Sequence, residues 1–125
     1  MQCDCMVSPS YTFATQHLPI QAAAFGKTPI ITNETGTSEL LTDKNAWLID
    51  SYEECCNIPE RPFPDVFTAK ETIRKPIIKS LSSCLIEAYQ NKYLRDQKKS
   101  NTNALLEQVS YEEVGKQLKD YLCIQ

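Results

Sequence analysis

One stretch of this sequence combines residue types that can bind an anionic ligand. A polar and aromatic loop at 11–17 follows a short apolar run and leads directly into an Ala-rich segment at 18–25. If that segment is helical, its first turn offers N–H groups without intrahelical partners and the positive end of the helix dipole, where phosphates bind. Gln21 in this segment can hydrogen-bond a ligand hydroxyl, or a backbone carbonyl can satisfy it, and both alternatives stay open.

Histidine and cysteine offer two further kinds of chemistry. His17, the only histidine, could donate to a phosphate or a sugar, or be a partly buried polar residue, and we assign it no catalytic role. Cys3, Cys5, Cys55 and Cys56 could in principle form a tetrathiolate zinc site, but they lack the paired C-x₂-C spacing of such sites. We expect buried or reduced thiols, with a metal or redox protein as an alternative.

Apolar and β-branched runs define the elements that must position these residues. In chain order they are a buried strand at 5–7, a helix at 18–25, a strand at 29–32, a helical turn or two at 38–41 and a strand at 46–49 that carries Trp47 into the core. Pro19 suits the first turn of the longer helix, and Gly26 is positioned to end it. This order and spacing are typical of a right-handed parallel βαβαβ unit.

The second half of the chain has helix-capping patterns and prolines in place of short apolar strands. Capping-box spacing at 51–54 and at 68–71 predicts two helix starts, and three prolines between them predict an extended connection. Pro76 can open a helix that runs to about Lys98, and a polar break at 100–103 follows. The core-facing residues of that helix are expected to include Tyr89 and Tyr93.

A third capping box, formed by Ser110 and Glu113, predicts a final helix. Its apolar face is expected to be buried and consists of Tyr111, Val114, Leu118, Tyr121 and Leu122.

The predicted fold class is α/β, with a partial Rossmann-like parallel sheet of about three strands, flanking helices and a C-terminal helical extension. Residues 1–50 form the βαβαβ half-domain, 51–75 a Pro-rich wrapping connection, and 76–125 helices that pack on the sheet. Three strands leave an edge and parts of both faces uncovered. We therefore expect either a partner or a longer enzyme to complete the sheet.

Composition excludes several classes of protein. The chain has 125 residues, 42% of them hydrophobic, and a formal net charge of −3, which argues against disorder and against a nucleic-acid backbone binder. No apolar run approaches the roughly 20 residues needed for a transmembrane helix, and no signal-peptide pattern is present. We expect a cytoplasmic protein.

The sequence contains none of the common nucleotide-binding or hydrolase motifs, namely a Walker loop, G-x-G-x-x-G, G-x-S-x-G or H-E-x-x-H.

The motif order resembles a known family. Ser8-Pro9-Ser10 ends a strand, a loop and helix lead to Gly26-Lys27-Thr28-Pro29, and Asn33, Gly36 and Glu39 precede Asn45-Ala46-Trp47-Leu48-Ile49. From the N-terminus to Ile49 this is similar to the second Rossmann-like domain of GT-B glycosyltransferases of family 4. The resemblance implies binding of a nucleotide-sugar donor, retaining transfer of a hexose, and no protein-bound metal or other cofactor.

The resemblance also implies a set of donor-binding residues. In that family two glutamates eight positions apart contact the sugar hydroxyls and the ribose. Here Phe13 and Gln21 occupy the positions of these two glutamates. In an alternative register, Thr12 occupies the position of the first glutamate. The implied donor-binding residues are Thr12, Phe13, Ala14, Thr15, Gln16, His17 and Gln21. The family's basic pair for the diphosphate and its acceptor domain lie upstream of the matched segment, so we assign no catalytic residue.

Two main functions follow, from different classes. The chain is either a glycosyltransferase-like fragment that contributes the donor site and is inactive without an N-terminal acceptor domain, or a non-catalytic interaction module or decayed remnant. Because neither of the two family glutamates is present in this sequence, the non-catalytic alternative is favoured. The expected partners are a nucleotide sugar and either the N-terminal domain or a second copy of the chain, with no nucleic acid.

Overall fold

The computed structural model describes residues 3–11, 16–33, 36–55 and 72–122 of the chain. The elements are β1 (Cys5–Ser8), α1 (His17–Ala24), β2 (Thr28–Thr32), α2 (Thr37–Leu40), β3 (Trp47–Ile49), β4 (Ser51–Cys55), β5 (Thr72–Pro76), α3 (Ile78–Gln90), α4 (Lys92–Gln108) and α5 (Tyr111–Tyr121). The order of strands and helices that the sequence predicts up to Ile49 is confirmed, and the fold class is α/β.

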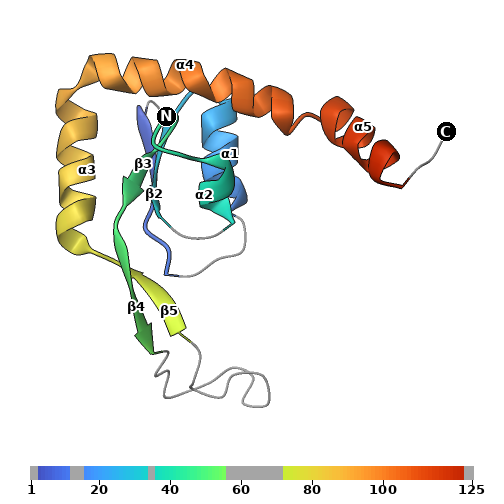
Figure 1. Ribbon diagram of the computed structural model, residues 1–125. Helices are drawn as coiled ribbons and strands as arrows, with labels where there is room; N and C mark the ends of the chain where they lie inside the picture. Colours follow the sequence, from blue (N-terminus) through green and yellow to red (C-terminus); the bar gives the residue numbers. More distant parts are fainter. Residues whose placement is uncertain (1–2, 12–15, 34–35, 56–71, 123–125) are drawn as a thin grey trace.

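The central sheet is parallel, with strand order β1-β2-β3. Met6 lies opposite Pro29, and Ile31 lies opposite Leu48. Because each successive strand is added on the same side, right-handed crossovers bring α1 and α2 to the same face of the sheet. Helix α3 covers the other face and packs chiefly on β3, which gives three layers (Figure 1).

Alternation along the strands divides the core between the two faces. Ile31 of β2 packs with Ala23 and Leu41 on the α1 side, whereas the neighbouring Ile30 packs with Trp47 and Cys84 on the α3 side. All five residues of β2 are buried, as expected for the central strand of a parallel sheet covered on both faces. Trp47 is a core residue, as predicted.

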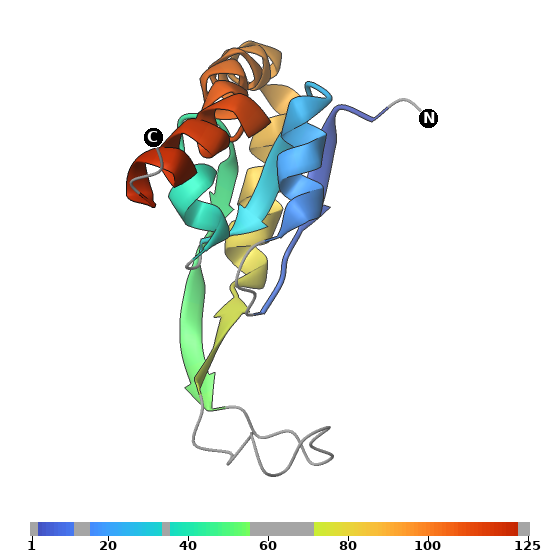
Figure 2. The ribbon, with the colours of Figure 1, turned by 90° about the vertical axis from the view of Figure 1, so that its right-hand side faces the viewer.

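Helix α4 runs across the end of the sheet at which the strands begin, and α5 continues from it away from the sheet (Figures 1 and 2). Ser110 caps α5 as predicted, because its Oγ accepts a hydrogen bond from the Glu113 N–H at 3.2 Å. No residue of α5 is buried, however. The expected burial of its apolar face is wrong for the chain by itself, because the short link at 109–110 directs α5 past the core.

Strand β1 is less buried than its apolar sequence predicts. It pairs only with β2 among the described strands, and Val7 is 41% exposed. An apolar run identifies a strand but does not show whether a helix covers it. Here α3 packs on β3 and leaves part of β1 open.

Residues 51–54 form a strand and not the helix start that their capping-box spacing predicts. Strand β4 pairs antiparallel with β5, and Arg74 and Lys75 form ion pairs with Glu53 and Glu54 across the two strands. Cross-strand pairing therefore outweighs the local signal. The second predicted capping box at 68–71 and the three prolines lie outside the described residues.

The long helix is predicted wrongly in three respects. Pro76 ends β5 and does not open the helix, which begins at Ile78. The helix breaks at Asn91, whose side chain caps α4 by accepting the Leu94 N–H at 3.0 Å, and α4 then continues through the polar stretch at 100–103. Tyr89 and Tyr93 are 86% and 79% exposed, so they are not core residues. Helix α4 runs in a different direction from α3 (Figure 1), which periodicity alone does not reveal.

The turn after α1 requires a glycine. Gly26 has φ of 68°, in the left-handed region that costs an L-residue about 1–2 kcal/mol. We expect Gly26→Ala to lower the free energy of unfolding by that amount, measured by urea denaturation. Gly115→Ala is the control, because a Cβ at this helical position meets nothing within 4 Å, and it should raise stability by about 0.5–1 kcal/mol. Equal effects of the two substitutions would contradict the left-handed turn.

Within the described residues, no helix has the length and apolar character needed to cross a membrane.

Candidate functional site

The amino end of α1 opens at the edge where the parallel strands end, which is where ligands of open α/β sheets bind. Gln16 immediately precedes the helix in extended conformation, and its side chain does not cap the first turn. Pro19, the third helical residue, has no N–H, and the Ile20 N–H belongs to the intrahelical bonds, so the free donors of this turn are the main-chain N–H groups of His17 and Leu18. The helix end therefore retains the features of a weak anion site.

Gln16 has a structural role that sequence reasoning missed. Its side chain accepts a hydrogen bond from the Ser8 hydroxyl and donates one to the Ser10 hydroxyl, and its main-chain N–H donates to Thr37 Oγ1 at 2.9 Å. Gln16 is 8% exposed. It therefore ties the end of β1 to the starts of α1 and α2.

The other predicted donor-binding residues are distributed differently. Thr12, Phe13, Ala14 and Thr15 lie outside the described residues. His17 and Gln21 are both exposed on α1. The sequence predicts a buried helix face in which Gln21 would need a partner, but an exposed amide is satisfied by water.

Four hydroxyl residues belong to this edge of the sheet although sequence reasoning did not select them as site residues. Ser8, Ser10 and Thr37 bond Gln16, and Thr32 Oγ1 donates to the Ser10 carbonyl at 2.8 Å. The signal that could have found them is the Ser-Pro-Ser sequence at a strand end, opposite a helix start. The edge is polar and, in these five side chains, uncharged.

The opposite edge of the sheet is closed by α4. Lys98 is 7% exposed, and its Nζ donates to the carbonyls of Asp43 and Ala46, the latter at 2.8 Å. The ammonium also lies 5.2 Å from the centre of the Trp47 ring. Burial lowers the pKa of Lys98, against the opposing charges of Asp43 and Glu87. Because it is buried and donates to two main-chain carbonyls, we assign Lys98 a structural role.

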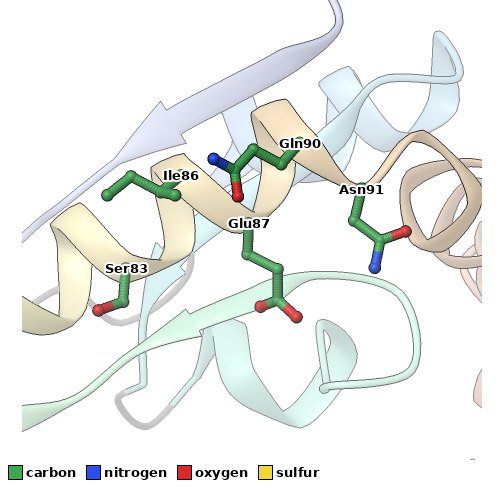
Figure 3. A pocket seen from close by; sticks show the side chains of 5 residues that line it. All are labelled: Ser83, Ile86, Glu87, Gln90 and Asn91. Carbon is green, nitrogen blue, oxygen red and sulfur yellow. The ribbon is translucent and has the colours of Figure 1, made fainter.

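A hollow of about 500 Å³ lies on α3. Figure 3 shows its lining residues, with the Glu87 carboxylate directed toward β3. That carboxylate accepts the Trp47 Nε1–H at 3.2 Å, and the Ser83 hydroxyl donates to the Lys79 carbonyl. The carboxylate and the hydroxyl are therefore both hydrogen-bonded within the protein, and we assign this hollow no catalytic role.

The described cysteines do not form a metal centre. Across 3–11, 16–33, 36–55 and 72–122, no group of three or more His, Cys, Asp or Glu side chains is arranged to hold a metal ion. Cys3, Cys5, Cys55 and Cys84 are free thiols. Burial raises the pKa of Cys5 and of Cys84, which disfavours the reactive thiolate form.

The fold defines this chain as an α/β protein with a Rossmann-like parallel sheet. A scan against protein-family models and searches of curated proteins and of solved structures found no match to it.

Proposed function

We propose that this chain contributes the donor side of a nucleotide-sugar glycosyltransferase, with the diphosphate bound at the amino end of α1. The observation that carries the proposal is the start of α1, left uncapped by Gln16, at the carboxyl edge of the parallel sheet. The motif resemblance between the N-terminus and Ile49 supports it. The acceptor domain, which in that family lies upstream of the matched segment, would supply the rest of the active site.

The residues of the proposed site would act by binding and orientation. Main-chain N–H groups of the first turn of α1 would bind the phosphate oxygens, and exposed Gln21 would hydrogen-bond a ribose or sugar hydroxyl. Gln16 would hold the start of α1 against the end of β1 through Ser8 and Ser10. Retaining transfer then requires electrostatic support of the leaving diphosphate, which neutral donors provide only in part.

Donor binding can be tested by titrating nucleoside diphosphates and their hexose conjugates, with calorimetry and amide chemical shifts as readouts. We expect dissociation constants in the millimolar range and shifts confined to the start of α1 and the loop before it. The proposal is wrong if no ligand binds at millimolar concentration, either to this chain alone or after an N-terminal half is supplied.

A charge substitution makes the test specific. Leu18→Asp puts a carboxylate on an exposed residue of the first turn of α1, and we expect it to weaken diphosphate binding roughly fivefold or more. Phe25→Asp introduces the same charge on an exposed apolar residue at the other end of α1 and should leave binding unchanged. Equal losses in both variants would point to a general charge effect and contradict the site.

A non-catalytic assembly function is the second candidate, and one observation favours it. The apolar face of α5 is exposed along its whole length, and part of the sheet beside α3 is uncovered. A protein whose role is association needs such surfaces, whereas donor binding does not explain them.

A further inference from the structure

Two apolar features of this chain are complementary to each other. The first is a hollow of about 260 Å³ beside α3, over the edge strand β1. Cys5 and Ile30 line it from the sheet, and Leu85, Ala88 and Tyr89 line it from α3. In Figure 2, β1 forms the margin of the sheet while α3 lies behind β2 and β3, so the hollow lies at the side of α3 that faces the edge strand.

The second feature is the apolar face of α5. It consists of Tyr111, Val114, Leu118, Tyr121 and Leu122, all exposed and all within one side of the helix at 3.6 residues per turn. Tyr111 is 100% exposed and Tyr121 is 86% exposed. An amphipathic helix of this kind is stabilised by packing, and α5 buries none of its residues in the chain to which it belongs.

Helix α5 cannot reach the hollow of its own chain. Only Val109 and Ser110 separate it from α4, and α4 carries it across the end of the sheet to the side opposite α3 (Figure 1). An α5 helix that packs in this hollow would therefore have to come from another molecule.

The distribution of charged side chains indicates the direction in which α5 would lie in the hollow. Asp4 and Arg95 line the apolar hollow and also an adjoining hollow in which four basic side chains meet two acidic ones. The basic side chains are Lys27, Lys92, Arg95 and Lys99. The first turn of α5 carries Glu112 and Glu113, whose ion pairs within α5 are with Lys116 alone among the described residues. The acidic end of α5 matches the basic end of the hollow.

We propose that two copies of this chain form a homodimer in which α5 of each packs into the hollow over β1 and beside α3 of the other. Glu112 and Glu113 lie at the basic end of the hollow, so that α5 runs antiparallel to α3. Two aromatic and three aliphatic side chains are buried at each of two symmetry-related contacts, which together reach the area of about 1000 Å² that a specific interface needs. The exchange is closed, because each copy gives one helix and receives one.

In this homodimer the partner in the assembly function is a second copy of the chain, and its formation does not depend on donor binding. Its test is sedimentation equilibrium of the full chain over a concentration series that reaches roughly 0.5 mM, a range that detects dissociation constants up to the millimolar level. We expect a rise from the monomer mass of 14.2 kDa to twice that value. A monomer at all concentrations would overturn the inference and would leave the diphosphate titration unaffected.

Substitutions on the two surfaces identify the contact. Leu118→Glu on α5 and Leu85→Glu in the hollow should each weaken association roughly tenfold or more, because each buries a charge in an apolar contact. Both residues are more than 40% exposed in the single chain, so both variants should fold, which circular dichroism checks. The controls are Lys116→Gln on the polar face of α5 and Ser83→Glu on the exposed outer side of α3, which make the same change in net charge and should leave association unchanged.

Mixing the two defective variants distinguishes this exchange from other dimers. The intact α5 of the Leu85→Glu chain fits the intact hollow of the Leu118→Glu chain, so the mixture should form a heterodimer more strongly than either variant self-associates. If instead Leu85→Glu dimerises like the original chain while Leu118→Glu does not, α5 pairs with another α5 and the proposed contact is wrong. No heterodimer in the mixture would also contradict it.

Discussion

Ile31→Ala should destabilise this protein by about 3–4 kcal/mol, because it leaves a cavity where four elements meet. The Ile31 side chain is fully buried and packs with Ala23 of α1, Leu41 after α2, Ala46 before β3 and Leu105 of α4. Small α/β domains have a total stability of about 5–15 kcal/mol, so this loss is a large share of it. Urea denaturation followed by circular dichroism measures it.

Two further substitutions keep the Ile31 test interpretable. Ile31→Val removes one methylene and should cost about 1 kcal/mol, which gives a measurable transition even if the alanine variant does not fold. Ile86→Ala removes an isoleucine side chain that is 57% exposed and should change stability by less than about 0.5 kcal/mol. A loss below about 1 kcal/mol for Ile31→Ala would mean that α1, α2 and α4 do not share one core over β2.

Lys98→Met should cost about 2–4 kcal/mol, because it leaves the carbonyls of Asp43 and Ala46 without their donor. Methionine preserves most of the apolar stem, so the loss reports mainly on the ammonium group. The neighbouring Lys99→Met is the control, since Lys99 is exposed, and it should change stability by less than about 0.5 kcal/mol. Similar losses in both variants would show that α4 does not close the edge of the sheet through Lys98.

The lowered pKa of Lys98 predicts a pH dependence with a definite sign. Desolvation in the folded state is the largest cause of the shift, so the folded protein gives up the proton at a lower pH than the unfolded chain. Between the two pKa values the unfolded state binds more protons, and stability rises with pH. The stability of the original chain relative to Lys98→Met should therefore increase as pH rises from the lowered pKa of the folded state toward the ordinary lysine pKa of about 10.5. A decrease over that window would contradict the burial of the ammonium.

The candidate site was only partly predictable. The helix at 17–24 and its position after a strand follow from local patterns, namely the Ala-rich run, Pro19 and Gly26. The role of Gln16 does not, because its partners Ser8, Ser10 and Thr37 come from three different segments. Which side chains of a loop face inward depends on contacts that the loop sequence does not contain.

The β4–β5 hairpin and the break at Asn91 show where local signals mislead. Ser51 to Glu54 satisfy a helix-capping pattern, yet Arg74 and Lys75 pair with this segment as a strand. The polar stretch at 100–103 predicts the end of a helix, yet it continues α4, in which Thr102 is buried. Tertiary contacts contribute more free energy than the small differences in intrinsic propensity.

The sequence by itself determined the order of strands and helices up to Ile49 and the amphipathic character of the last helix, because both depend on side-chain periods within single segments. The tertiary structure alone decided which apolar faces are covered, and that Lys98, 55 residues from Asp43, is buried against it. Burial is a relation between distant segments, and a one-dimensional pattern does not contain it. The apolar face of α5 is the clearest case, since its periodicity predicts a buried helix and the chain supplies nothing in the described residues to bury it.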